Sequence, residues 1–249
     1  MKLKNKTFLV TGANGGMGKA VVDLLLKENA NVVGCDLQTD GLLEYKQNSQ
    51  FKAFQGDLTE EKTVKEMFQK TKDTFGSIDG LANIAGIAQS ATPIDKVGLE
   101  EWHRIMDINM TMMFLTCREA AIYMKGEGKG SIVNVGSVSV TRPRPGLQSY
   151  IASKGAVEAF SKALALELAP NHINVNVLHP GPSDTTMLGE FSAEGVSVED
   201  TKKDVFESSI PLGKLLKPED IAHSIKYLLS DEAKMITGSV LHVDGGRNI

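Results

Sequence analysis

The chain reads Thr11-Gly12-Ala13-Asn14-Gly15-Gly16-Met17-Gly18 directly after its first apolar run, and this stretch decides the fold. The run before it, residues 7–10, has strand-forming side chains, whereas residues 17–29 after it have helical periodicity. Glycines at such a junction permit a sharp turn and a close approach of the backbone to a ligand. The free N–H groups at the start of the helix attract a pyrophosphate. We therefore expect a strand, a turn and a helix that together bind a dinucleotide.

A lone glycine-rich turn is a weak signal, because it can also join a strand to a helix and bind nothing. Here the second apolar run, residues 31–36, ends in Asp36, twenty residues after Gly16. A carboxylate at this position can accept hydrogen bonds from a ribose 2′-hydroxyl, and it would repel a 2′-phosphate. Neither Leu37 nor Asn14 supplies a cation for such a phosphate. The sequence thus predicts NAD(H) in preference to NADP(H); the alternative is that Asp36 only caps a loop.

Short β-branched runs alternate with helical segments along the whole chain. This alternation predicts parallel strands joined by right-handed crossovers. The expected fold class is α/β, a Rossmann-type doubly wound, mostly parallel seven-stranded sheet with helices on both faces. Because no repeat or long polar linker divides the chain, residues 1–249 are expected to form one dinucleotide-binding domain. We expect strands at 7–11, 31–36, 51–55, 80–83, 131–135, 174–179 and 239–243, and helices at 17–29, 60–75, 99–125, 148–168 and 218–230.

Composition excludes several classes of function. The 249 residues carry a formal charge of −4, which is unlike a general nucleic-acid binder. No run of about 18 apolar residues is present, so no membrane span is expected. The segment before Thr7 is too short for a secretory signal. Two cysteines, Cys35 and Cys117, and five scattered histidines predict neither a disulfide framework nor a metal site. We expect a soluble, cytoplasmic protein with reduced thiols.

Three polar side chains form a second candidate group. Tyr150 and Lys154 are four residues apart in the predicted helix 148–168, so they share one face. Alone, such a pair usually belongs to a solvated helix face. Ser137 lies thirteen residues before Tyr150, where the apolar run 132–135 has just ended. Because the ends of parallel strands face the ligand crevice, Ser137 is expected there.

At this point the sequence closely resembles the short-chain dehydrogenase/reductase family, in its compact, non-extended branch, over essentially the whole chain. Two positions depart from the family pattern: Ile84 replaces a second Asn, and Pro182 is unusual after Pro180-Gly181. The matching motifs are the turn Thr11-Gly12-x3-Gly16-x-Gly18, Asp57-Leu58, Asn83-Ile84-Ala85-Gly86, Asn109, Ser137, the pair Tyr150 and Lys154, Pro180-Gly181 and Asp244-Gly245-Gly246.

The resemblance implies a catalytic role for four residues. Tyr150 would be the general acid/base at the substrate oxygen. Lys154 would hold the nicotinamide ribose and, together with the positive nicotinamide, lower the pKa of the phenol. Ser137 would orient the substrate oxygen, with Ser139 as a weak competitor. Asn109 would support a water that relays protons from Lys154.

The resemblance also implies the cofactor contacts. Asp57-Leu58 resembles the pair that contacts adenine, and Asn83, Ala85 and Gly86 would line the ribose side. The segment with Pro180, Gly181 and Thr185 resembles the one that holds the nicotinamide carboxamide, and Thr186 competes with Thr185 for that contact. The predicted cofactor-binding residues are Gly12, Asn14, Gly15, Gly16, Met17, Gly18, Asp36, Leu37, Asp57, Leu58, Asn83, Ala85, Gly86, Tyr150, Lys154, Pro180, Gly181 and Thr185.

The implied activity is that of an NAD-dependent oxidoreductase interconverting a secondary alcohol and a ketone on a small-molecule substrate. One alternative is a 3-oxoacyl-(acyl carrier protein) reductase using NADPH, which the overall pattern also resembles. Another is a nucleotide-sensing module without turnover, which the retention of all four catalytic residues disfavours. The family further implies a homotetramer, or at least a dimer, built through the helices at 99–125 and 148–168.

Two weaker features concern the substrate. Residues 183–213 form a long segment without strong structural signals, and we expect it to close over the substrate. Arg142 and Arg144 lie between Ser137 and Tyr150. Their guanidinium groups are suited to a carboxylate or phosphate on the substrate. The alternative is that they are solvated or contact another subunit.

Overall fold

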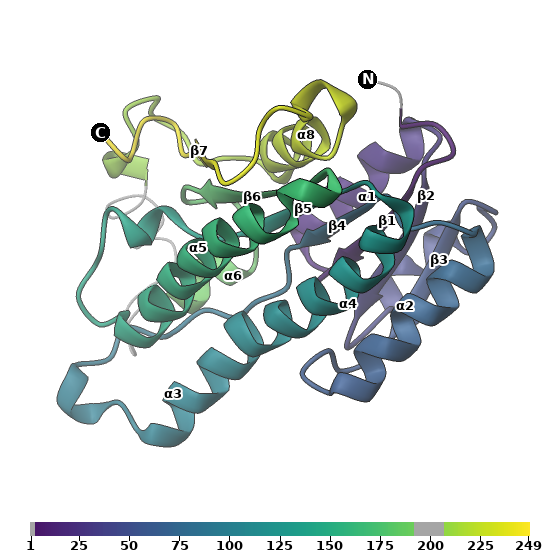
Figure 1. The fold of residues 1–249 in the computed structure, drawn as a ribbon. Helices are drawn as coiled ribbons and strands as arrows, with labels where there is room; N and C mark the ends of the chain where they lie inside the picture. The colour runs from purple at the N-terminus through teal and green to yellow at the C-terminus, as the bar shows by residue number, and fades with distance from the viewer. Residues whose placement is uncertain (1–2, 192–206) are drawn as a thin grey trace.

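The computed structural model describes residues 3–191 and 207–249. Its described strands form one seven-stranded sheet in the order β3-β2-β1-β4-β5-β6-β7, and every neighbouring pair is parallel (Figure 1). The predicted doubly wound α/β fold is therefore confirmed, and the sheet is entirely parallel. The strands are β1 (Thr7–Thr11), β2 (Asn31–Asp36), β3 (Phe51–Gln55), β4 (Gly80–Asn83), β5 (Gly130–Val135), β6 (Ile173–Pro180) and β7 (Val240–Val243).

Helices cover both faces of the sheet. Apolar side chains of α1 and α8 pack on one face, and those of α2, α4 and α5 pack on the other, where Figure 1 shows them in front. Each face has its own buried cluster, because the strands between them are apolar on both sides. The helices are α1 (Gly16–Lys27), α2 (Glu61–Phe75), α3 (Leu99–Met106), α4 (Met112–Glu127), α5 (Gln148–Leu168), α6 (Met187–Glu190) and α8 (Pro218–Leu228).

The predicted continuous helix 99–125 is wrong in one respect. A π-helical turn, Asp107–Thr111, separates α3 from α4 and carries Asn109. Such turns insert one extra residue into a helix and are frequent at functional sites. The other predicted elements either have the observed bounds, as β1, β2, β3, β4 and α5 do, or differ from them by one or two residues at one or both ends. Residues 192–206 of the predicted substrate segment lie outside the described residues.

The strand order positions the candidate site. β1 is flanked by β2 on one side and β4 on the other, so the chain reverses its winding direction between β1 and β4. Ligands of open α/β sheets bind at the carboxyl ends of the strands beside such a reversal. Gly12 follows β1 with φ +67°, and a Cβ there would lie 2.8 Å from the Cα of Ala85, which follows β4. The two strand ends therefore meet closely only because residue 12 is glycine.

Within the described residues, no helix is both long and apolar enough to cross a membrane.

Candidate active site

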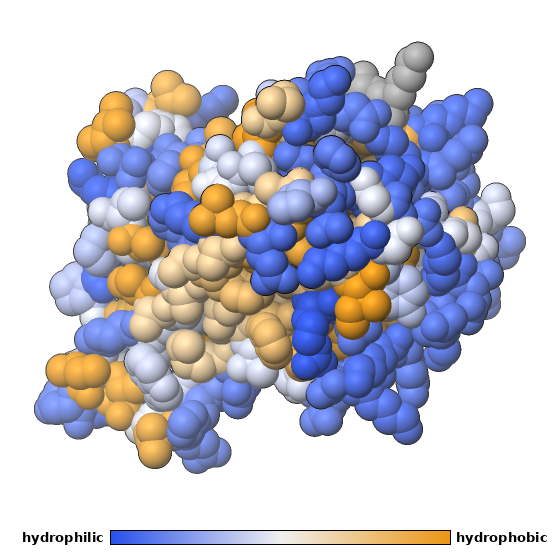
Figure 2. All heavy atoms as spheres, in the orientation of Figure 1, coloured by the Kyte–Doolittle hydropathy of each residue, from blue (hydrophilic) through white to orange (hydrophobic). Residues whose placement is uncertain are grey.

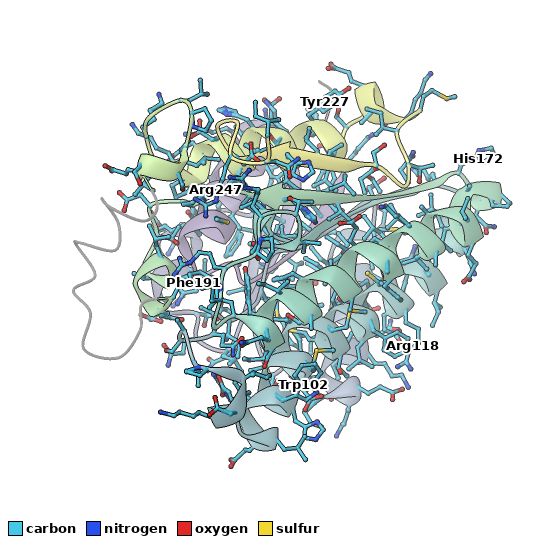
Figure 3. The ribbon with its side chains drawn as sticks, turned by 90° about the vertical axis from the view of Figure 1, so that its left-hand side faces the viewer. Trp102, Arg118, His172, Phe191, Tyr227 and Arg247 are labelled. Atoms are coloured by element: carbon cyan, nitrogen blue, oxygen red, sulfur yellow. The ribbon has the colours of Figure 1, made fainter. Side chains whose placement is uncertain are left out.

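A cavity of about 620 Å³ opens at the carboxyl ends of the central strands. Asp36 and Leu37, which follow β2, line it at one end, whereas Tyr150, Phe191 and Arg247 line it at the other. Figure 3 shows Phe191 and Arg247 on the same side of the molecule, from segments far apart in the chain. The cavity thus connects the predicted nucleotide site with the predicted catalytic residues.

The glycine-rich turn leaves the start of α1 open toward the cavity. Gly15 caps the helix without any side-chain hydrogen bond, and no acidic residue stands in the first turn. A Cβ on Gly18 would lie 2.0 Å from the carbonyl oxygen of Gly12, so this turn cannot form with a larger residue there. Uncapped N–H groups and a positive helix end make this a site for an anion such as a pyrophosphate.

Asp36 has the geometry expected of a ribose ligand. One carboxylate oxygen, Oδ2, accepts a 3.0 Å hydrogen bond from the main-chain N–H of Asn14, and Oδ1 accepts a longer one of 3.4 Å from that of Gln38. The neighbouring Leu37 is 61% exposed and apolar. The carboxylate is therefore oriented by the turn while it lines the cavity, and the side chain beside it has no positive charge.

Sixteen of the eighteen predicted cofactor residues line the cavity, and Asn14 and Asn83 do not. The side chain of Asn14 turns away and donates to Asp40 (3.2 Å). Asn83 is buried inside the sheet, where its amide donates to Asn134 (2.9 Å) and accepts from Thr116 (2.9 Å). The lining set comprises Gly12, Gly15, Gly16, Met17, Gly18, Asp36, Leu37, Asp57, Leu58, Ala85, Gly86, Tyr150, Lys154, Pro180, Gly181 and Thr185, and the competitors Ser139 and Thr186 also line it.

Ser137, Tyr150 and Lys154 come together at the substrate end. The Ser137 hydroxyl follows β5, accepts hydrogen bonds from the main-chain N–H and the hydroxyl of Ser139, and contacts the Tyr150 phenol. The Nζ atom of Lys154 lies 5.9 Å from the centroid of the Tyr150 ring. Both Tyr150 and Lys154 are almost fully buried. The ring edge of Phe191 packs on Tyr150 with centroids 5.1 Å apart.

Burial dominates the acid–base properties of these groups. It raises the pKa of Tyr150 above its usual value, and the hydrogen bond with Ser137 only partly opposes this rise. The lowering of the Tyr150 pKa that the resemblance implies is therefore not produced by the charges of the chain itself. Burial also lowers the pKa of Lys154 to about 8, because the ammonium is withdrawn from water.

Asn109 is fully buried and does not line the cavity. Its Oδ1 accepts from the main-chain N–H of Ile87 (2.8 Å), and its Nδ2 donates to the Ile87 oxygen (3.1 Å) and to Ser153 (3.1 Å). A Cβ on Gly86 would lie 3.0 Å from Oδ1 of Asn109 and 3.3 Å from Nζ of Lys154. The side chain of Asn109 thus holds the segment after β4 against α5, next to Lys154.

Two residues of the site, Gln89 and Arg247, were missed by reasoning from the sequence, whereas Phe191 lies within the predicted substrate segment 183–213. Gln89 accepts a 3.0 Å hydrogen bond from the Tyr150 main-chain N–H and so fixes the start of α5. Phe191 covers the Tyr150 ring, and Arg247 lines the cavity from beyond β7. For Arg247 a signal existed, because it directly follows the motif Asp244-Gly245-Gly246. Among the described residues, no group of three His, Cys, Asp or Glu side chains is arranged to hold a metal ion.

Comparisons with known proteins agree with this geometry. Residues 12–248 match the family model described as enoyl-(acyl carrier protein) reductase. The chain is 34% identical to a 3-oxoacyl-[acyl-carrier-protein] reductase of Thermotoga maritima over 99% of both chains. It is 35% identical to 3beta-hydroxysteroid dehydrogenase 1 of Eggerthella lenta over 99% of this chain and 95% of that protein.

A solved structure shares the fold closely. The 3-ketoacyl-(acyl-carrier-protein) reductase of Brucella melitensis, complexed with NADH, superposes with a TM-score of 0.91 at 36% identity, covering 99% of this chain and 100% of that one. These relatives differ in substrate, so the likeness establishes the class of reaction and leaves the substrate open. The chain belongs to the short-chain dehydrogenase/reductase family and is an NAD(P)-dependent oxidoreductase that acts on secondary alcohols and ketones.

Proposed function

We propose that the protein is an NAD(H)-preferring enzyme that interconverts a secondary alcohol and a ketone with Tyr150 as the general acid/base. The observation that carries this proposal is the cavity, which joins an open helix start and Asp36 at one end to Ser137, Tyr150 and Lys154 at the other. The bound nicotinamide supplies the hydride donor or acceptor. The chain supplies position, exclusion of water and proton transfer.

Each catalytic side chain has a distinct task in this proposal. The neutral phenol of Tyr150 protonates the oxygen of a ketone during reduction, which suits a group whose pKa burial has raised. In the alcohol-oxidising direction the phenol must first lose its proton, and the positive charge of the oxidised nicotinamide assists this loss. Ser137 donates a hydrogen bond to the substrate oxygen, and Lys154 holds the nicotinamide ribose. Asn109 positions Lys154 and the segment after β4, and a water beside this segment relays the proton.

The preference for NAD(H) rests on Asp36. A 2′-phosphate would lie beside this carboxylate and the apolar Leu37, and like charges at such a distance repel. The alternative is a 3-oxoacyl-(acyl carrier protein) reductase, and the 34% identity to such an enzyme supports it. If this alternative enzyme used NADPH, it would require a cation near Asp36 to bind the 2′-phosphate. A nucleotide sensor without turnover is disfavoured, because Ser137, Tyr150 and Lys154 are retained and converge.

We also propose a homotetramer, or at least a dimer, that forms through α4 and α5. Apolar side chains on these helices remain exposed in the monomer, including Phe114 (40%), Ile122 (59%) and Leu166 (80%). Figure 2 shows an apolar area over α5 in the middle of this face. Burying such an area in a second subunit is favourable. Size-exclusion chromatography with light scattering tests this: a monomer at micromolar concentration would contradict it.

The reaction is tested by screening secondary alcohols with NAD⁺ and NADP⁺ while the absorbance of the reduced nicotinamide is followed. The panel should contain sugars, polyols, steroids, hydroxy acids and a 3-hydroxyacyl thioester. Turnover of at least one alcohol, with the higher kcat/KM for NAD⁺, is expected. Preferential oxidation of the 3-hydroxyacyl thioester with NADP⁺ would favour the alternative.

A further inference from the structure

Positive charge is concentrated in the cavity. The sequence has five arginines, and four of them, Arg104, Arg142, Arg144 and Arg247, line it. The whole chain is net negative, at −4, so this concentration is local. Arg104 already forms two hydrogen bonds, of 2.7 and 3.0 Å, with the carboxylate of Glu101. The other three are Arg142, Arg144 and Arg247.

These three arginines lie close together although they come from two segments. Arg142 and Arg144 precede α5, and Arg247 follows β7. The charges of both lower the pKa of Arg247, in addition to the effect of burial. Arg142 also donates a 3.3 Å hydrogen bond to the main-chain oxygen of Ile249, two residues after Arg247. They form one group, which we call the arginine cluster (Arg142, Arg144 and Arg247).

Arg247 is the most informative member. It is only 9% exposed, and its buried Nη1 atom has no hydrogen-bond partner among the described residues. Leaving a buried charged donor unsatisfied is strongly unfavourable, so such groups usually face a ligand or ion. Figure 3 shows Arg247 and Phe191 on the same side of the molecule, and both line the cavity. The ring of Phe191 packs on Tyr150, so the open donor belongs to the same cavity as the candidate catalytic residue.

Asp244 supplies a negative charge near Arg247 and opposes the lowering of the Arg247 pKa. Its two carboxylate oxygens accept from the main-chain N–H groups of Gly246 and Asn248, each at 2.9 Å, and Nη1 of Arg247 has no hydrogen-bond partner among the described residues. The acidic residues in the cavity lining are Asp36, Asp57 and Asp107. The first two lie at the nucleotide end. The cavity lining also includes the apolar side chains of Leu147, Met187, Leu188 and Phe191.

We propose that the arginine cluster binds an oxyanion, a carboxylate or phosphate group carried by the alcohol or ketone substrate. This proposal rests on the proposed function, because it assigns the substrate class of the same cavity. The guanidinium fork matches both oxyanions with two parallel hydrogen bonds. Desolvation by the apolar lining strengthens such charge-assisted bonds. Arg247 and Arg142 supply the donors, and Arg144 adds positive charge.

The test is isothermal titration calorimetry on the NADH-saturated protein with three probes of one skeleton: cyclohexanecarboxylate, cyclohexyl phosphate and the neutral methyl cyclohexanecarboxylate. At least one anion is expected to bind about 10-fold or more tightly than the ester. Arg247→Met should weaken anion binding by about 10- to 100-fold, and should leave ester binding unchanged. Arg247→Lys should restore part of the affinity, since it keeps the charge but loses the fork.

Two further variants keep the test decisive. Arg142→Met changes an exposed side chain, so it should fold and weaken anion binding by about 3- to 10-fold. Arg118→Met is the matched control, because Arg118 lies on α4, outside the cavity lining, and pairs with Glu61 at 2.9 Å. Unchanged NADH affinity reports correct folding of each variant. Equal binding of the ester and both anions, or an equal loss in Arg118→Met, would overturn the proposal.

The titrations with the three probes also distinguish a failure of the anion site from a failure of the proposed reaction. Tighter binding of the carboxylate identifies a hydroxy or keto acid, and tighter binding of the phosphate identifies a phosphorylated alcohol. Calorimetry requires no turnover. Anion binding without turnover of any alcohol would therefore contradict only the proposed reaction, whereas turnover of neutral alcohols without anion binding would contradict only the anion site.

Discussion

The ammonium of Lys154 donates a 3.0 Å hydrogen bond to the main-chain oxygen of Val135, the last residue of β5. This bond ties α5 to the strand end that Ser137 follows, so one contact orients two candidate catalytic groups. Because Lys154 is only 4% exposed, burial lowers its pKa to about 8. The amine is therefore mostly protonated at pH 7 and mostly neutral above pH 8.

This shift predicts an unusual chemical reactivity. Acetic anhydride reacts with the neutral amine, so acetylation of Lys154 should reach half of its maximal rate near pH 8. Lys65, an exposed lysine on α2, provides the comparison. Peptide mass spectrometry after short exposures at pH 6–11 measures both. Saturating NADH should protect Lys154 and leave Lys65 unprotected; a labelling midpoint shared by the two lysines would contradict the shifted pKa.

Removing the phenol hydroxyl should stop the chemistry without disturbing the cofactor. Tyr150→Phe keeps the ring that packs on Phe191, and it removes only the proton donor. We expect turnover to fall by about 10²- to 10⁴-fold, the usual contribution of a general acid/base. NADH affinity, measured by fluorescence titration, should stay within about two-fold. Tyr227→Phe on α8, outside the cavity lining, is the control. Turnover retained in Tyr150→Phe would remove Tyr150 from the acid/base role.

Cofactor choice should respond to the charge of Asp36. Asp36→Asn removes the repulsion toward a 2′-phosphate and weakens the hydrogen bonds to a 2′-hydroxyl. NADH affinity is expected to fall by about 10-fold, while NADPH affinity rises. Adding Leu37→Arg should strengthen the shift, because it supplies the missing cation. Fluorescence titration of both cofactors measures the ratio of the two dissociation constants.

Asp57→Asn provides the control for this prediction. Asp57 also lines the cavity, but its carboxylate already accepts from the main-chain N–H (2.9 Å) and the hydroxyl (2.7 Å) of Thr59. The Asp57→Asn substitution should therefore change the affinities for NADH and NADPH by similar factors. If Asp36→Asn behaved in the same way, Asp36 would have no part in the choice of cofactor.

Local patterns predicted the elements that position the site, because strands buried on both faces and a glycine turn leave strong signals in a sequence. The bounds of α5 agree with the predicted 148–168. The π-helical turn at Asp107–Thr111 was not predictable, since it adds one residue without any change of composition. Its cause is tertiary: Asn109 bonds to Ile87 and Ser153, residues distant in the chain.

The same limit applies to the cavity. Asn14 and Asn83 stand in the predicted motifs, yet one turns toward Asp40 and the other toward Thr116 and Asn134. Spacing along a chain places the backbone of a motif, whereas hydrogen-bond partners decide where each side chain points. Arg247 is the opposite case: it stands outside the predicted site, yet the pairing of β6 with β7 brings the segment after β7 to the cavity that Tyr150 also lines.

A buried histidine predicts how the stability of the protein depends on pH. His179 on β6 is fully buried, and it packs edge-on against His242 of β7 with ring centroids 5.1 Å apart. Neither ring nitrogen of His179 has a hydrogen-bond partner among the described residues, and Glu158 lies 3.6 Å from Nε2. Burial lowers the pKa of His179 to about 4; Glu158 opposes this, whereas His242, Lys154 and Lys162 add to it.

Between pH 6.5 and 4 the unfolded chain therefore binds a proton at His179 that the folded protein does not. The free energy of unfolding should fall as the pH drops through this window, by about 3 kcal/mol for a shift of this size. His179→Asn should remove most of this dependence, while the exposed His103→Asn should keep it. Urea unfolding at pH 7.5 and pH 4.5 measures the difference for each protein. The prediction requires that His179 is neutral in the folded protein. Two results would show instead that its imidazole is charged or solvated in the native state. One is a wild-type protein that gains stability on acidification, and the other is a His179→Asn variant whose stability depends on pH as strongly as that of the wild type.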